Sequence, residues 1–413
     1  MKMALYKLNH KDIPVAIFQI DRTDVLYAEI LKDHLNHLPL PLKRIIHYKD
    51  EFVKSETDLS YLLNEDGCLL FDCWLSDREI PVNRENYSAY IKKGTTARQF
   101  MLSNYGYSFT DCYWIQDSQN NYIWNDICYL RNSVDDFVSV KDANHMYKGQ
   151  NATLGGQLEK FWYKRDGALK LCKKTGKLYD VLNAREIFAS EIYKRLGYKN
   201  HCDYEFLYDS TGDIVGCKCF SFVKNNLELV TAYDLLEEYN CTQQDDVYEK
   251  VIDFAYQYGL DRKECSDYMD IQTMVDYLIT NRDRHQENIG FLRDAETLTI
   301  VSPAPVYDSG SCKHLEGEYP EDLENTVING LYYTEGELLK HVKNLTLINI
   351  ELLPTREQYK EILDKCNITE RRKAELLSLY ENKKEYLYEL QKKSSLLYQD
   401  DIEKQKEEDL SLE

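Results

Sequence analysis

Residues 281–291 read NRDRHQENIGF, and residues 303–310 read PAPVYDSG. The first stretch follows an apolar helical pattern and places a carboxylate, Asp283, five positions before an amide, Asn288. The second stretch places another carboxylate, Asp308, between a predicted strand and a Ser-Gly pair. A polar loop after a helix is often only a solvated surface loop. The ordered series of Asp, Arg, His and Asn, followed by a second aspartate, instead favours a site with a chemical role.

Phosphoryl transfer is the reaction that this set of side chains fits. It requires oxygen ligands for Mg²⁺, a carboxylate that orients and deprotonates the attacking hydroxyl, and cations on the transferred phosphate. Asp283 and Asn288 have the D-x-x-x-x-N spacing of the catalytic loop in protein kinases, where the aspartate meets the substrate hydroxyl and the asparagine binds metal. Asp308 suits the second metal-ligand position.

Taken together, the two stretches resemble the HipA-like serine/threonine kinases, and the Asp-Arg-His order is also similar to that of phosphoinositide kinases. The resemblance implies a two-lobed protein-kinase-like fold, with a β-rich N-lobe and a mainly helical C-lobe, that uses ATP and Mg²⁺. It implies that Asp283 is the catalytic base and that Asn288 and Asp308 bind the metal. It also implies that Arg284 and His285 support the catalytic loop.

A glycine-containing stretch upstream, residues 153–160 (TLGGQLEK), resembles the flexible phosphate loop of the same family. Glycine permits close approach and positive φ, so a loop with Gly155 and Gly156 can offer backbone N–H groups to a phosphate. The alternative is an ordinary turn. In this family a hydroxyl residue of the loop can be autophosphorylated, and the resemblance places Thr153 there. Leu158 departs from the polar or proline residue that many family members have before the lysine.

The strand predicted over residues 168–173 (ALKLCK) is expected to carry the lysine that pairs the nucleotide phosphates. Three lysines compete for this role: Lys170, Lys173 and Lys174. Alternate residues of a strand share one face, so Lys173 shares the face of the neighbouring leucines and is preferred. The alternative is that all three are solvated charges. The helix partner of the lysine is predicted to be Glu186, with Glu191 as its rival.

The remaining pattern predicts an α+β protein of several domains. Short strands at 4–8, 15–20 and 25–30 predict a small antiparallel meander, and Asp166-Gly167 predicts a hairpin turn. Apolar spacing predicts helices over 183–196, 247–258, 268–279 and 369–393. The predicted domains are an N-terminal α+β accessory domain (1–145), a kinase N-lobe (146–232), a helical kinase C-lobe (233–399) and an acidic, frayed tail (400–413).

The N-terminal region also carries part of the resemblance. Residues 78–84 (REIPVNR) and 108–115 (SFTDCYWI) are similar to an N-terminal extension found in a subset of HipA-like proteins, so the similarity covers most of the chain. For Tyr113, Trp114 and Trp124, a buried aromatic cluster is favoured over a ligand-binding role.

Composition excludes several classes of function. Among 413 residues, 51 Lys and Arg against 71 Asp and Glu give a net charge of −20, which repels polyphosphate and anionic membranes. The 12 cysteines lie far apart, with Cys217 and Cys219 closest, so reduced thiols are expected rather than a zinc ribbon or a disulfide framework. With neither a signal peptide nor a membrane span in the pattern, we expect a cytoplasmic protein.

The predicted partner is a protein substrate with a serine or threonine acceptor. By family analogy alone, the chain is also predicted to be the toxin of a toxin–antitoxin pair, with an antitoxin-type protein partner. A lipid or small-molecule kinase of the same fold is the first alternative, because the nucleotide chemistry is shared. A catalytically silent, kinase-shaped interaction protein is the second, although Asp283, Asn288 and Asp308 together weigh against it. A zinc hydrolase is disfavoured because the nine histidines show no compact ligand spacing.

Overall fold

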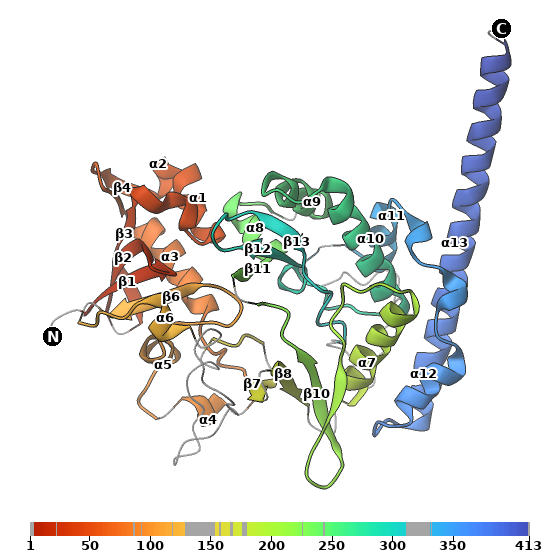
Figure 1. The fold of residues 1–413 in the computed structure, drawn as a ribbon, viewed down its shortest axis with the longest axis horizontal. Coiled ribbons are helices and arrows are strands. Elements are labelled where there is room, and N and C mark those ends of the chain that lie inside the picture. Colours follow the sequence, from red (N-terminus) through yellow and green to blue (C-terminus); the bar gives the residue numbers. More distant parts are fainter. Residues whose placement is uncertain are drawn as a thin grey trace. The chain divides into compact units, whose positions relative to one another are not determined.

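The protein is a mixture of helices and antiparallel sheets, seen in a computed structural model (Figure 1). The structure describes residues 4–128, 153–175, 180–310 and 331–411, except positions 22, 86, 92, 118, 157, 166, 167, 225, 243 and 332, with side chains as far as 394. The chain divides into two compact units. The first unit comprises Met1–Gly176, Cys202–Arg262 and Gln286–Pro305, and the second comprises Lys177–His201, Lys263–His285 and Val306–Glu413. The domain boundaries expected from the sequence stay predictions.

A six-stranded antiparallel sheet begins the first unit, with strand order β4-β5-β3-β2-β1-β6. Its strands are β1 (Ala4–His10), β2 (Ile13–Asp21), β3 (Asp24–Leu31), β4 (Val53–Glu56), β5 (Ser60–Leu63) and β6 (Tyr113–Asp117). β2 and β3 alternate buried and more exposed residues along much of their length, as expected for a sheet with one face against a core, whereas the last three residues of β1 are all buried. The predicted N-terminal meander is confirmed, and the sheet is larger than the sequence pattern indicates.

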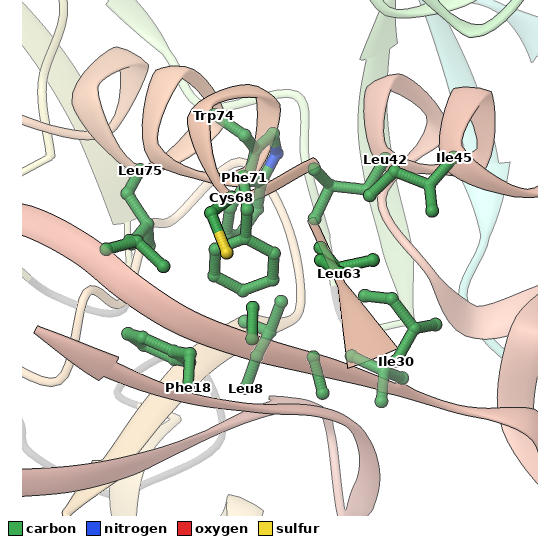
Figure 2. Close-up of a cluster of buried hydrophobic side chains, with 14 of the residues drawn as sticks. Leu8, Phe18, Ile30, Leu42, Ile45, Leu63, Cys68, Phe71, Trp74 and Leu75 are labelled. Carbon is green, nitrogen blue, oxygen red and sulfur yellow. The ribbon is translucent and has the colours of Figure 1, made fainter. Parts of the chain in front are cut away.

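The core of this sheet lies under α3 (Glu65–Asp77) and α1 (Leu40–His47). Figure 2 shows Phe71 of α3 directed at the apolar side chains of the sheet, among them Leu8 and Phe18. The Phe18 and Phe71 rings lie 5.0 Å apart between centroids, and both side chains are fully buried. Burial of each such ring contributes roughly 1.5–3 kcal/mol to folding. Asn64 caps the start of α3 by accepting a hydrogen bond from the Gly67 N–H.

Two further antiparallel sheets belong to the first unit. One has the order β7-β8-β10-β9, from β7 (Glu159–Arg165), β8 (Ala168–Lys174), β9 (Glu205–Tyr208) and β10 (Ile214–Phe220). The other consists of β11 (Leu227–Thr231), β12 (Gly290–Asp294) and β13 (Ile300–Pro303). In addition to α1 and α3, the first unit contains the helices α2 (Lys49–Phe52), α4 (Tyr87–Tyr90), α5 (Ala97–Ser103), α6 (Trp124–Ile127), α8 (Ala232–Glu238) and α9 (Val247–Gln257). The predicted turn at 166–167 lies outside the described residues, although β7 and β8 pair on either side of it.

An aromatic cluster confirms the packing interpretation of the N-terminal tryptophans. Trp114 and Trp124 are buried together with Trp162 of β7, and the Trp114 Nε1–H donates to the main-chain oxygen of Lys11 at 2.6 Å. The 11 cysteines that the structure describes are all reduced thiols, as expected.

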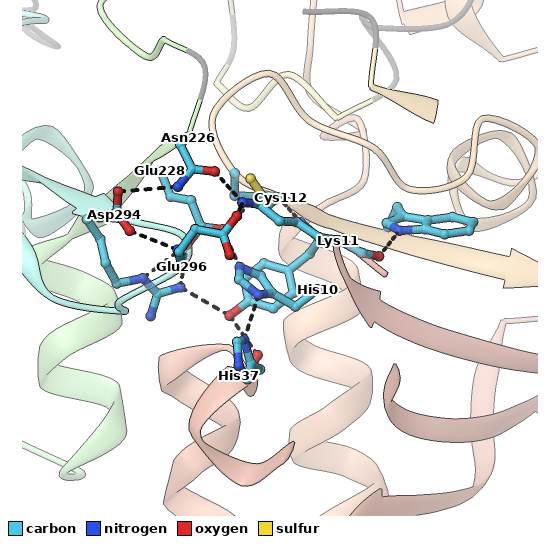
Figure 3. Close-up of polar contacts among 12 residues, drawn as sticks. His10, Lys11, His37, Cys112, Asn226, Glu228, Asp294 and Glu296 are labelled. Carbon is cyan, nitrogen blue, oxygen red and sulfur yellow. Dashed lines mark hydrogen bonds and ion pairs between the residues drawn. The ribbon is translucent and has the colours of Figure 1, made fainter. Parts of the chain in front are cut away.

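A fully buried carboxylate, Glu228 of β11, connects the six-stranded sheet with the three-stranded sheet (Figure 3). It interacts with His10 Nε2 at 3.0 Å and accepts hydrogen bonds from the Cys112 N–H at 2.9 Å and from Arg293 Nε and Nη2 at 3.1 and 2.9 Å. Burial alone would raise the pKa of Glu228, but the charges of Arg293 and His10 and these hydrogen bonds hold it well below its usual range. The carboxylate is therefore charged and fully paired at neutral pH.

The histidine pair in this cluster predicts a pH-dependent stability. His10 Nδ1 and His37 Nδ1 lie 2.9 Å apart, and burial together with His10 and His34 lowers the pKa of His37 to about 4. Between about pH 6.5 and pH 4 the unfolded chain then binds more protons at this site than the folded chain. The free energy of unfolding therefore falls as the pH is lowered from about 6.5 to about 4, and this group causes no loss of stability above pH 6.5.

We therefore expect the melting temperature to drop less between pH 7 and pH 5 in His37→Asn than in the wild type, measured by calorimetry. His341→Asn, which removes a histidine from the other compact unit, is the control. An equal drop in wild type and His37→Asn would show that His37 titrates normally.

The second unit is mainly helical. It contains α7 (Asp180–Arg195), nearly all of α10 (Arg262–Ile279), α11 (Glu335–His341), α12 (Arg356–Leu363) and α13 (Glu370–Ser411). Phe188 of α7 stacks on Tyr359 of α12 with ring centroids 3.6 Å apart, and Tyr380 of α13 meets the Phe188 ring edge-on. The helix predicted to end at Lys393 continues to Ser411, so the expected frayed tail is helical in the structure. None of the described helices combines the length and the apolar composition needed to cross a bilayer.

Candidate functional site

The site predicted around Asp283 begins where α10 ends. The Thr280 N–H donates to the Tyr277 oxygen at 3.1 Å, and the Asn281 N–H donates to the Asp276 oxygen at 2.8 Å. These two bonds form a Schellman motif, which requires a left-handed residue, and Thr280 fills that position with φ at 58°. Glycine usually occupies this position because a β-branched side chain is strained there. The helix therefore stops sharply, and the polar residues that follow leave its axis at once.

The strained threonine gives a prediction about stability. Because alanine keeps the left-handed penalty and glycine removes it, we expect Thr280→Gly to be more stable than Thr280→Ala by about 1 kcal/mol. Chemical denaturation of the two variants measures the difference. Elsewhere in a helix the order is the reverse, so an alanine variant that is equal or more stable would contradict the strain.

Arg284 and Asp276 form the buried centre of the site. Arg284 Nε lies 2.6 Å from Asp276 Oδ2, and its Nη2 lies 2.9 Å from Oδ1. Asn281 Nδ2 donates to the same Oδ1 at 2.9 Å. The side chains of Arg284 and Asp276 are 3% and 7% exposed. Burial favours neutral arginine, but the neighbouring Asp276 carboxylate raises the pKa of Arg284 above its usual value. The guanidinium therefore stays charged and fixed.

The same guanidinium links the segment of Asp283 to the segment of Asp308. Arg284 Nη1 donates to the main-chain oxygen of Tyr307 at 2.5 Å, and Nη2 donates to the Ser309 hydroxyl at 3.1 Å. Tyr307 and Ser309 stand on either side of Asp308, whose φ of 53° is also left-handed. Both carboxylates, Asp283 and Asp308, are half-buried. One buried arginine thus fixes the backbone next to both predicted functional aspartates.

Glu186 of α7 holds the other side of the Asp308 segment. This glutamate is 3% exposed, and its Oε2 accepts a hydrogen bond from the Ser309 N–H at 2.9 Å. Gly310 packs so closely on α7 that an added Cβ would lie 2.5 Å from both the Glu186 Cγ and the Leu182 oxygen. The rival Glu191 instead pairs with Arg195 on the helix surface at 2.7 Å. The predicted pairing of Glu186 with a lysine stays a prediction.

The three candidate lysines of β8 differ in their surroundings. Lys173 is 4% exposed, and its ammonium lies 5.0 Å from the centroid of the Tyr204 ring. Lys170 and Lys174 are half-buried and pair with Glu205 and Glu159 at 3.4 and 3.3 Å. A buried lysine on a strand is less readily explained as a solvated surface charge. Lys173 is therefore the most buried of the three lysines, and its predicted contact with the nucleotide phosphates stays a prediction.

The glycine turn at residues 154–156 belongs to the first unit. The Thr153 hydroxyl donates to the Tyr107 oxygen at 2.9 Å, and Gly155 and Gly156 are exposed, with Gly156 at φ 87°. Arg84 donates to the main-chain oxygens of residues 154, 155 and 156. Hydrogen bonds from Arg84, a residue of the N-terminal region, therefore hold the turn in place.

The remaining two predicted residues, Asn288 and His285, fall in different units. Asn288, 5% exposed, ends the 3-10 turn Gln286–Asn288 in the first unit. His285 is half-buried and belongs to the second unit. The predicted functions of Asn288 in metal binding and of His285 in loop support stay predictions.

Sequence reasoning missed Asp276 and the contacts of Arg84. Asp276 could have been found as the lone carboxylate within the apolar run 274–279 (MVDYLI), since a carboxylate at a core position requires a cationic partner. For Arg84 no local signal exists, because its acceptors lie about seventy residues away in the chain.

Oxygen donors suitable for Mg²⁺ are present in the part of the chain that the structure describes. Among the residues that the structure describes, no group of three or more His, Cys, Asp or Glu side chains could hold a metal ion. Mg²⁺ in phosphoryl-transfer sites usually takes one or two carboxylates and completes its shell with water and phosphate oxygens. The anchored, half-buried Asp308 carboxylate fits that smaller requirement.

Similarity to known proteins is confined to solved structures. No family model matches the chain, and no curated protein is similar to it. Among solved structures, it is similar to a Helicobacter pylori proinflammatory kinase, CtkA, with a TM-score of 0.44 and 18% identity over 60% of this chain and 94% of that chain. At this level of similarity no shared activity follows.

Proposed function

We propose that the chain is an ATP- and Mg²⁺-dependent kinase of the HipA-like type that phosphorylates serine or threonine in a protein substrate. The observation that carries the proposal is the Arg284 network, which fixes the backbone beside Asp283 and Asp308 through a buried pair with Asp276. Phosphoryl transfer depends mainly on positioning and charge, and a rigid frame for two carboxylates meets that need. The two-lobed arrangement, with lobes at 146–232 and 233–399, is part of this proposal.

Four of the predicted residues have a direct role in this reaction. Asp283 accepts the proton of the substrate hydroxyl while the oxygen of that hydroxyl attacks the terminal phosphorus of ATP. As the new bond forms, the bond from that phosphorus to the bridging oxygen of ADP breaks. Asp308 and Asn288 would hold Mg²⁺, which when bound neutralises charge on the phosphate oxygens. Lys173 would bind the phosphates, since its burial suits it to a role other than a solvated surface charge.

The acceptor and the partner are further parts of the proposal. A protein acceptor and an antitoxin-type partner rest on the sequence resemblance.

A radiolabel experiment tests the proposal. The full chain is incubated with γ-labelled ATP and Mg²⁺ beside protein, lipid and aminoglycoside acceptors, with EDTA as the metal control and Asp308→Ala as the variant. Label on protein, lost with EDTA and restored in Asp308→Ala only at raised Mg²⁺, is expected. Label on the lipid or the aminoglycoside would replace the protein kinase with a small-molecule kinase. No label and no ATP binding would overturn the proposal in favour of an interaction protein.

A further inference from the structure

Arg84 of the N-terminal region makes an unusual set of contacts with the glycine turn. Its Nε donates to the Gly156 oxygen at 3.0 Å, and its Nη2 donates to the oxygens of Leu154 and Gly155, each at 2.5 Å. Three consecutive carbonyl groups therefore point at one guanidinium. The arginine is 3% exposed, so this arrangement is buried and not a chance surface contact.

The direction of the carbonyls determines the direction of the amides. In a trans peptide the C=O and the N–H of one unit point to opposite sides, and the described chain contains no cis peptide. When the oxygens of Leu154 and Gly155 face Arg84, the N–H groups of Gly155 and Gly156 face away from it. Both glycines are exposed, and neither amide donates a hydrogen bond to any residue that the structure describes.

The backbone of the two glycines suits an anion. Gly156 has φ at 87°, whereas Gly155 lies outside the left-handed region. In a turn that contains such a left-handed residue, successive N–H groups can point toward one concave site, which suits a phosphate oxygen. An added Cβ on Gly156 would lie 2.8 Å from Lys160 Nζ, so a cation is close to the same turn.

Arg84 is not explained as an ordinary structural ion pair. Within the described ranges no carboxylate forms an ion pair with it. Its guanidinium lies 5.9 Å from the centroid of the uncharged Tyr90 ring, and its Nη1 is buried without a hydrogen-bond partner. Burial lowers the pKa of Arg84, which expresses the cost of keeping this charge inside the protein. By contrast, the equally buried Arg98 pairs with Asp72 at 2.9 Å and with Glu79. A costly buried charge whose acceptors are three carbonyls of one turn suggests a function of that turn.

We propose that Arg84 is a positioning residue that holds the turn at 154–156 with the Gly155 and Gly156 amides directed outward, ready to bind a nucleotide phosphate. This inference rests on the proposed function and adds to it a contribution from the N-terminal region. The residue acts through the turn and touches no substrate itself.

Two measurements on the full chain test this role, with Arg84→Gln, Arg84→Lys and the control Arg98→Gln. The first is cleavage by chymotrypsin after Leu154, which requires no nucleotide. We expect Arg84→Gln to be cleaved at least about tenfold faster than the wild type, because a released turn opens more often. The second is MgATP binding by calorimetry, in which we expect the Kd to rise about tenfold as preorganisation is lost. For Arg84→Lys we expect a cleavage rate and a Kd between those of the wild type and Arg84→Gln, since an ammonium cannot reproduce the planar fork of the guanidinium.

The outcomes separate this inference from the proposed function. Faster cleavage and weaker MgATP binding in Arg84→Gln, with neither in Arg98→Gln, support the positioning role. MgATP binding as tight as in the wild type would overturn it, whatever the cleavage rate. Equal effects in Arg98→Gln would overturn it as well, because they would reflect general loosening of the N-terminal region. A wild type that binds no MgATP would overturn the proposed function itself and, with it, the role of Arg84.

Discussion

Asp283→Asn is expected to lower phosphoryl transfer by about 10²–10⁴-fold, because asparagine cannot accept the proton of the attacking hydroxyl. This loss corresponds to roughly 3–5 kcal/mol of barrier height. The Asp283 N–H donates to Asn281 Oδ1 at 3.2 Å through the main chain, so the substitution leaves that turn contact in place. We therefore expect ATP affinity and melting temperature to change little. Steady-state kinetics at saturating ATP, beside calorimetric ATP binding, measure the two effects separately.

Glu287→Gln is the matched control for Asp283→Asn. Glu287 is an exposed carboxylate only four residues further along the chain, and its substitution removes one charge in the same way. Turnover near that of the wild type is expected for the control. If Asp283→Asn kept turnover within about threefold of the wild type, the residue would not be a general base.

Asp276→Asn is expected to lower the free energy of unfolding by roughly 3–5 kcal/mol, the usual effect of leaving a buried charge without its partner. The Arg284 guanidinium would stay inside the protein, 3% exposed, and would face the Tyr307 oxygen, the Ser309 hydroxyl and a neutral amide in place of the Asp276 carboxylate. Because the same guanidinium fixes the backbone beside Asp308, a loss of activity should accompany the loss of stability. Denaturant titration of the full chain measures the stability change.

A double-mutant cycle separates the ion pair from other effects. Asp276→Asn combined with Arg284→Gln removes both charges, and we expect it to be less destabilised than the sum of the single variants. Asp267→Asn on the same helix breaks a surface pair with Lys263, whose side chain is 77% exposed, and should change stability by less than about 1 kcal/mol. Strict additivity in the cycle would show that Asp276 and Arg284 do not stabilise each other.

Local patterns predicted the elements well where one face of a helix or strand is buried. The strands β2 and β3 and the helices α7, α9 and α10 follow from alternation and helical spacing, because those periods reflect which residues meet the core. The spacing of Asp283, Asn288 and Asp308 predicts phosphoryl transfer from residue types and order alone, and that function stays a prediction. The predicted end of α13 was wrong by 18 residues, since its last turns carry no apolar stripe that separates a helix from a charged tail.

Long-range partners could not be predicted in this way. Glu228 stands between two leucines in the short strand β11, and nothing in that local sequence marks it as buried. Its partners His10, Cys112 and Arg293 come from three other regions of the chain. The same holds for Arg84, whose acceptors are main-chain oxygens and thus independent of side-chain identity. Single-sequence reasoning finds residue types and spacings, whereas these interactions depend on how distant segments pack.

The buried Glu228 has a consequence for how the chain can be shortened. A polypeptide starting at residue 146 would keep Glu228 and Arg293 but discard His10 and the Cys112 amide, which satisfy the remaining lone pairs of the carboxylate. The faces of β11 and β12 now covered by the N-terminal sheet would meet water. The opening 128 residues are thus integral to the sheet formed by β11, β12 and β13, and a chain without them should aggregate.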